Sequence, residues 1–147
     1  MEKLYKLLSD TQASLFVLFQ KTWNYHWNVV GEDFPQLHSL FGEQYEEMFE
    51  EIDRLTEHMR YLNIRPISTM TRMAEVSSID GPANLNQAID AKGMVKQLLA
   101  DNEKLIEMLK DISEEAEKKR SYATANLVQD LMETHGVFVF KLWSYLQ

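Results

Sequence analysis

Apolar residues recur every three or four positions along most of the chain, which is the period of an amphipathic helix. A first helix is expected over residues 3–28, and its middle, residues 15–19, is apolar all round. Gly31 interrupts the pattern, and Pro35 suits the first turn of a second helix over residues 34–62. The second helix carries one continuous apolar stripe, formed by Leu37, Phe41, Met48, Ile52, Leu55, Met59 and Leu62.

The helical pattern weakens over residues 63–90, where Pro66, Gly81 and Pro82 indicate a crossover with one short helix near residues 69–76. A third helix is expected over residues 91–118. Lys118, Lys119 and Arg120 form a turn, and Ser121 can cap a fourth helix that runs to residue 146.

Four long amphipathic helices, with a long link between the second and the third, predict an all-α chain with a ferritin-like four-helix bundle. Residues 1–147 form a single domain, because no repeat, low-complexity segment or composition shift divides them. An ordinary bundle without any chemical site has the same helix pattern. The architecture alone therefore leaves the function open.

The amino-acid composition limits the kinds of site, location and partner that this protein can have. The chain has 147 residues, is 45% hydrophobic and 26% charged, and contains no cysteine, which excludes disulfides and thiolate metal sites. It shows neither a secretory signal nor an apolar run long enough for a membrane span, so we expect a cytoplasmic protein. The net charge of −8 argues against nucleic acid as a generic partner and is compatible with cation binding.

The di-iron sites of many ferritin-like bundles use a Glu-x-x-His motif on two helices. The chain has four histidines, and none has a carboxylate three residues before it. That motif is therefore absent. The residues at those positions, before His26, His38, His58 and His135 in turn, are Trp23, Pro35, Leu55 and Met132.

A different set of possible metal ligands remains: His26, His38, Asp53 and Glu57. Asp53 and Glu57 share a helix face, and imidazole combined with carboxylate suits Fe(II). His38 and Asp53 are fifteen residues apart on one helix. That separation is roughly 22 Å at the rise of an α-helix, so one chain cannot bring both to one metal.

A two-fold dimer removes this difficulty. If the second helix packs antiparallel on its copy, crossing near residues 45–46, His38 of one chain faces Asp53 of the other and two equal sites form. The corner after Gly31 folds His26 back toward His38. A second line on this helix has the required character, apolar in the middle and ligand-bearing at its ends: His38, Gly42, Tyr45, Phe49 and Asp53.

The alternative is that these four residues are ordinary packed or solvated side chains, as we predict for His58 and His135. Trp27, next to His26, is predicted to lie in the core or an interface, and beside iron it could also take up an oxidising equivalent.

The motif of residues 25–38 resembles the Dps family, the DNA-protection-during-starvation mini-ferritins. The matching residues are Tyr25-His26-Trp27-Asn28-Val29, Gly31, Phe34 and Leu37-His38, followed by Asp53-x-x-x-Glu57. The likeness continues through residues 94–101, residues 123–127, His135 and residues 142–146, and so covers essentially the whole chain.

The resemblance implies a hollow shell of twelve subunits that oxidises Fe(II), preferably with hydrogen peroxide, and stores the ferric mineral. By matching positions, His26 and His38 come from one subunit, and Asp53 and Glu57 come from its partner. An acidic stripe either lines the cavity or is simply a solvated face: Glu43, Glu46, Glu47 and Glu50.

Three departures from the family pattern qualify this expectation. Gly42 stands where the family usually has an acid, and Glu43, about 100° round the helix, is a poor substitute. The region of the family's acidic pore reads Lys118-Lys119-Arg120, with Asn126 where an Asp is common. The chain also has no basic terminal tail, which argues against direct DNA binding.

These departures leave two alternatives to an active ferroxidase. One is a Dps-like shell or metal-binding protein with impaired iron oxidation, in which zinc could replace iron. The other, less favoured, is DNA compaction through contacts of whole shells.

Overall fold

The computed structural model describes residues 1–82 and 89–147. Residues 83–88, part of the predicted crossover, lie outside the described residues. Five helices and no strand occur in the described ranges: α1 (Glu2–Asn28), α2 (Phe34–Tyr61), α3 (Met70–Val76), α4 (Ala91–Lys118) and α5 (Tyr122–Tyr145).

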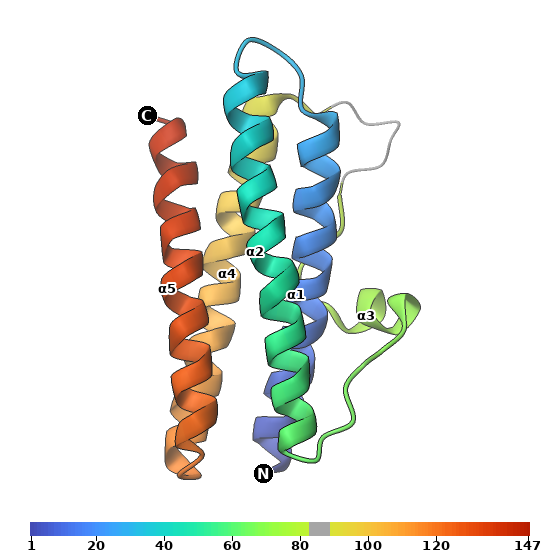
Figure 1. Cartoon of the computed structure of the whole chain (residues 1–147), viewed down its shortest axis with the longest axis vertical. Helices are drawn as coiled ribbons and strands as arrows, with labels where there is room; N and C mark the ends of the chain where they lie inside the picture. The colour runs from blue at the N-terminus through green and yellow to red at the C-terminus, as the bar shows by residue number, and fades with distance from the viewer. Residues whose placement is uncertain (83–88) are drawn as a thin grey trace.

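Four long helices form the bundle, and the short α3 stands beside it next to α1 (Figure 1). α1 packs on α2, α3 and α4, and α5 packs on α4 and α2. The all-α bundle with a long crossover between α2 and α4 is therefore confirmed, and each predicted boundary lies within one residue of the observed one. No helix in the described ranges is both long enough and apolar enough to cross a membrane.

The core is built from the apolar stripes that the sequence pattern predicts. All four long helices contribute fully buried leucines, and α2 adds Phe41, Met48 and Met59 from its predicted stripe. Two members of that stripe, Ile52 and Leu62, are half-buried and pack on the core from its margin. Burial of one continuous core fixes which face of α2 remains outward, and this outward face carries the candidate site.

Two of the long helices end in the same way, with a left-handed residue that closes the helix. After α2, Asn63 has φ +62°, and the backbone N–H of Ile64 reaches back to Met59 O at 2.8 Å. After α4, Arg120 has φ +58°, and Ser121 N lies 2.8 Å from Ala116 O.

The start of α5 differs in detail from the prediction. Ser121 does occupy the N-cap position, but its side chain accepts no backbone N–H. Its hydroxyl instead lies 2.7 Å from the hydroxyl of Thr124, so the predicted capping bond is wrong.

Candidate metal centre

The corner between α1 and α2 brings His26 and His38 together. α1 ends at Asn28, Val29 is extended, and Gly31 takes φ +114°, a backbone conformation that favours glycine. The N–H of Phe34 then donates to Gly31 O at 3.1 Å as α2 begins. The reversal places the last turn of α1 beside the first turns of α2, as the sequence predicted.

The two imidazoles are held by a reciprocal pair of hydrogen bonds, which we call the histidine clasp. His26 Nδ1 lies 2.6 Å from His38 O, and His38 Nδ1 lies 2.7 Å from His26 O. The two rings stack with centroids 3.8 Å apart and planes at 16°. Each ring is thereby fixed by the other residue's backbone.

The clasp also decides which nitrogen of each ring can bind a metal. A carbonyl oxygen can only accept, so both Nδ1 atoms must carry a proton and donate it. In the neutral imidazole the other nitrogen, Nε2, then has a free lone pair. Both rings are half-buried, so the clasp presents two oriented nitrogen donors near the surface.

Aromatic side chains enclose the clasp. The ring of Phe34 stacks on His38 with a centroid distance of 4.9 Å, and Tyr45 lies 5.1 Å from His26. Trp23 stacks on Tyr45 at 5.5 Å and contacts Trp27 at 4.6 Å. Trp27 itself is 55% exposed, so it lies outside the core of the single chain, and of its two predicted places the interface stays a prediction.

The predicted carboxylate ligands lie further along α2, apart from the clasp. Asp53 and Glu57 are exposed, and neither makes a hydrogen bond or ion pair within the described part of the chain. Across the described ranges, one chain gathers no group of three or more His, Asp or Glu side chains that could hold a metal ion. The structure therefore brings His26 and His38 together and leaves the two acids separate.

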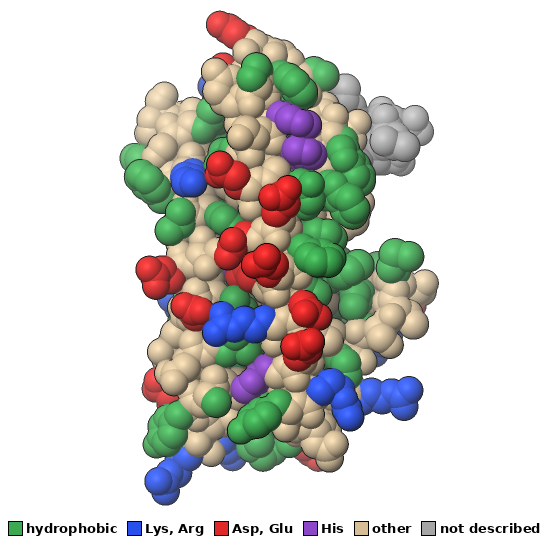
Figure 2. All heavy atoms as spheres, viewed as in Figure 1, with side chains coloured by type: hydrophobic (Ala, Val, Ile, Leu, Met, Phe, Trp, Pro, Cys, Tyr) green, Lys and Arg blue, Asp and Glu red, His purple; other side chains and the backbone are tan. Residues whose placement is uncertain are grey.

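We call the histidine clasp the first half-site, and Asp53 with Glu57 the second half-site. Exposed acidic side chains lie on α2 between these two half-sites. On the face shown in Figure 2, two adjacent histidines lie toward one end of the molecule, acidic side chains run below them, and hydrophobic side chains lie beside them. The four glutamates of the predicted acidic stripe are all exposed: Glu43, Glu46, Glu47 and Glu50.

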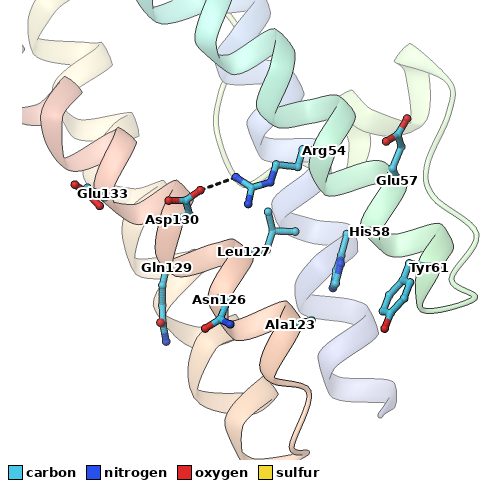
Figure 3. Close-up of a pocket in the computed structure, with 10 residues that line it drawn as sticks. All are labelled: Arg54, Glu57, His58, Tyr61, Ala123, Asn126, Leu127, Gln129, Asp130 and Glu133. Atoms are coloured by element: carbon cyan, nitrogen blue, oxygen red, sulfur yellow. Dashed lines mark hydrogen bonds and ion pairs between the residues drawn. The ribbon is translucent and has the colours of Figure 1, made fainter.

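A cavity of about 930 Å³ lies between α2 and α5, near the second half-site. Arg54 spans it to Asp130, with 2.6 Å between Nη1 and Oδ2, and Glu57 is also among the residues that line it (Figure 3). His58 Nε2 lies 2.8 Å from the hydroxyl of Thr124. Burial, helped by the charge of Arg54, lowers the pKa of His58. Arg54 thus pairs across the bundle, and His58 has a structural contact, as predicted.

The residues that depart from the family's acidic pattern lie at the end of α5 that borders this cavity. Asn126 lines the cavity, and Lys118, Lys119 and Arg120 are exposed where α4 ends. The single chain therefore places basic side chains where the family resemblance implies an acidic pore.

The sequence analysis missed a buried polar cluster in the bundle core. His135 is fully buried, with Nε2 2.9 Å from Glu51 Oε1 and Nδ1 2.7 Å from Asn102 Oδ1. Gln44, also on α2, is 1% exposed, and its amide atoms have no hydrogen-bond partner among the described residues. A signal existed, because Gln44 and Glu51 continue the helical spacing of the predicted apolar stripe.

Comparison with known proteins identifies the family. The ferritin-like domain family matches residues 5–147. A DNA protection during starvation protein from Helicobacter pylori is 30% identical over 98% of this chain and 99% of its own length. This chain belongs to the Dps family of ferritin-like proteins. A low temperature-induced protein from Nostoc is 34% identical over 96% of this Dps chain and 78% of its own length.

Solved Dps structures share the fold over nearly the whole chain. Dps from Thermosynechococcus elongatus has a TM-score of 0.93 and 28% identity, covering 99% of this chain and 91% of its own. The Vibrio cholerae Dps protein has a TM-score of 0.92 and 27% identity, covering 99% and 90%. It is described as a member of a broad superfamily of ferritin-like diiron-carboxylate proteins. The family expected from residues 25–57 is thereby confirmed.

Proposed function

We propose that this Dps protein oxidises Fe(II) at sites shared between two copies of the chain, preferring hydrogen peroxide as oxidant, and stores the ferric product inside a shell of twelve subunits. The observation that carries this proposal is the histidine clasp, which holds two imidazoles with their Nε2 atoms free. Membership of the ferritin-like family supports iron as the substrate.

Each residue has a role in this proposal. His26 and His38 bind iron through Nε2, and Asp53 and Glu57 of the facing copy supply the carboxylates. Two neutral imidazoles and two carboxylates match the charge of one divalent ion, and such a donor set leaves coordination positions open for an oxidant. Within residues 1–82 and 89–147 of one chain, neither the two imidazoles of the clasp nor the exposed carboxylates of Asp53 and Glu57 belong to a group of three or more side chains that could hold a metal ion.

The surface between the two half-sites supports the two-fold contact. Phe49 is 64% exposed in the single chain and lies on α2 between His38 and Asp53. Its ring contacts Phe19 at 6.1 Å and so extends the aromatic surface of α1 and α2. Large exposed apolar side chains in a contiguous patch mark interaction surfaces, and an antiparallel second copy covers them symmetrically.

A complementation experiment tests whether the site is shared. His38→Ala and Asp53→Ala chains are each purified and assembled alone, and both are expected to lose the fast rise in ferric absorbance after Fe(II) and peroxide are mixed. Chains of both kinds are then unfolded, mixed in equal amounts and reassembled. A mixed dimer has one site that lacks both substituted ligands and one site that is intact. Random pairing makes about half of the dimers mixed, so about a quarter of all sites should regain activity.

Two outcomes count against the proposal. If wild-type protein oxidises Fe(II) no faster than the two variants, it is not a ferroxidase. If both variants are inactive and the mixture stays inactive despite reassembly, the four residues do not form a shared site. Oxygen in place of peroxide, at equal concentration, is expected to give the slower reaction.

The second candidate is a Dps-like shell that binds metal but has impaired ferroxidase activity. The observation behind it is Gly42, which offers no carboxylate beside the clasp. Zinc would accept the same imidazoles and carboxylates without redox chemistry. Wild-type protein that binds Fe(II) at the clasp but does not oxidise it with peroxide would favour this candidate.

Direct DNA binding is not part of the proposed function, and the cytoplasm is its proposed location. Phosphate binding needs clustered lysines and arginines, whereas this chain has a net charge of −8. A gel shift at physiological salt should show no tight complex, and a tight one would restore DNA compaction as a function.

A further inference from the structure

Gly42 lies directly against the ring of His26. It is buried in α2, and a β-carbon built on it would lie 3.1 Å from His26 Cε1 and 3.2 Å from His26 Nδ1. Such distances are tighter than nine in ten real β-carbon contacts, so in this chain the His26 ring would have to shift by a few tenths of an ångström to admit a side chain at position 42.

His26 has little freedom to move while the clasp persists. Its Nδ1, one of the two atoms nearest the built β-carbon, also donates to His38 O at 2.6 Å. Its ring is stacked on His38 at 3.8 Å and contacts Tyr45 at 5.1 Å. A shift away from residue 42 must therefore stretch the hydrogen bond or disturb the ring stack.

We propose that Gly42 is a positioning residue of the metal site, and that its missing side chain makes the room in which the histidine clasp forms. Gly42 thus fixes two Nε2 donors instead of adding a carboxylate. Imidazole donors suit divalent transition ions, whereas carboxylate and water suit Mg²⁺. The inference rests on the proposed function for the metal, but the clasp itself can be tested in the metal-free protein.

The chain offers a matched control for a glycine substitution. Gly136 also lies inside a long helix, and a β-carbon built on it meets nothing within 4 Å. Gly42→Ala and Gly136→Ala therefore each add one β-carbon to a glycine inside a helix. Only the β-carbon at position 42 meets the His26 ring.

The first measurement reads the imidazole tautomers in assembled, metal-free protein labelled with ¹⁵N-histidine. Two-bond ¹H–¹⁵N correlations should show two rings with a proton on Nδ1 and a bare Nε2, assigned with His26→Gln and His38→Gln variants. Gly42→Ala should lose this pattern for His26, and Gly136→Ala should keep it.

The second measurement reads metal binding, with Co²⁺ as an oxidation-resistant probe followed by its visible absorption. Loss of the backbone contacts that orient ligating histidines should weaken Co²⁺ binding by about 10- to 100-fold in Gly42→Ala. Gly136→Ala should bind as wild type does. Gly42→Asp should oxidise Fe(II) no faster than wild type, because its β-carbon meets the same ring.

A double-mutant cycle keeps the inference testable if Gly42→Ala folds poorly. Gly42→Ala should lower the thermal unfolding midpoint when His26 is present. In a His26→Ala background the ring is gone, so the same substitution should raise the midpoint, as Gly136→Ala does.

The inference is overturned if Gly42→Ala keeps both Nδ1–H rings and wild-type Co²⁺ affinity, or if Gly42→Asp oxidises iron faster than wild type. Those results would not affect the proposed function, because the wild-type protein could still oxidise Fe(II). Conversely, if Gly42→Ala breaks the clasp but wild type oxidises no iron, the positioning role stands and the proposed function fails.

Discussion

At the scale of single residues, buried polar side chains fix which parts of the bundle tolerate change. Lys21 is 3% exposed, and its Nζ lies 2.8 Å from Asp101 Oδ2 and 3.1 Å from Asp80 O. Burial raises the pKa of Asp101 although the hydrogen bond and charge of Lys21 oppose the rise. The lysine therefore partly offsets the cost of burying this carboxylate.

Lys21→Met should destabilise the protein by about 3 kcal/mol at neutral pH, because it leaves the Asp101 carboxylate buried without its cation. Folded Asp101 then has a still higher pKa than unfolded Asp101, so the folded state binds more protons between the two values. Stability must rise as pH falls through that window. Urea unfolding at pH 7.5 and pH 5 checks both effects, with Lys96→Met on the exposed face of α4 as the control. A variant no less stable than this control would contradict the prediction.

The cluster of Glu51, His135 and Asn102 supports a second prediction about buried polar groups. His135→Leu should cost about 3 kcal/mol, because it leaves the Glu51 carboxylate buried without its partner. Glu51→Met combined with His135→Leu removes both partners and should cost about 1 kcal/mol, since Asn102 Oδ1 alone loses its contact. Denaturant unfolding of the two single variants and the double variant gives the coupling. Additive losses would show that the pair is not coupled.

At the scale of helices, one face of α2 packs in the core and another face carries the proposed metal ligands. One face carries the core stripe from Leu37 to Met59, and the other carries the clasp, Phe49 and the two acids. α2 and α4 each end at a residue in the left-handed backbone conformation, and this conformation costs less free energy for one residue type than for the other. Asn63 is a residue type that tolerates the left-handed conformation, whereas Arg120 is not.

Arg120→Gly should therefore stabilise the end of α4 by about 0.5 to 1 kcal/mol, since glycine adopts φ +58° without a β-carbon clash. Arg120→Gln removes the charge but keeps the β-carbon, and should give no gain. Thermal unfolding midpoints compare the two. An equal gain in both variants would assign the effect to charge rather than to backbone conformation.

At the scale of the whole molecule, the site depends on how copies of the chain meet. Phe49→Glu puts a charge on the proposed two-fold contact, about one helical turn from the crossing near residues 45–46. The helix is expected to remain intact because the side chain is largely exposed. The variant should lose the dimer, and with it fast iron oxidation, but keep its helical circular dichroism.

Light scattering coupled to size exclusion checks this loss of assembly. Ala100→Glu, on the exposed surface of α4, introduces the same charge away from the contact and should leave mass and activity unchanged. If Phe49→Glu keeps the wild-type mass and rate, the two copies do not meet through this stripe.

The sequence by itself determined the helices, the bundle and the crossover, because apolar spacing decides which face of a helix leaves water. It also predicted the corner that brings His26 to His38, because Gly31 and Pro35 restrict the backbone there. It could not reveal the clasp or the fit of His26 against Gly42, because both depend on atomic distances between two helices. Nor did it show that Glu51, Asn102 and His135 meet, since three separate helices supply them. Tertiary packing decided those contacts: burial favours a partner for each polar atom, and the way the helices lie together sets which partners are within reach. For the amide of Gln44, none is within reach among the described residues.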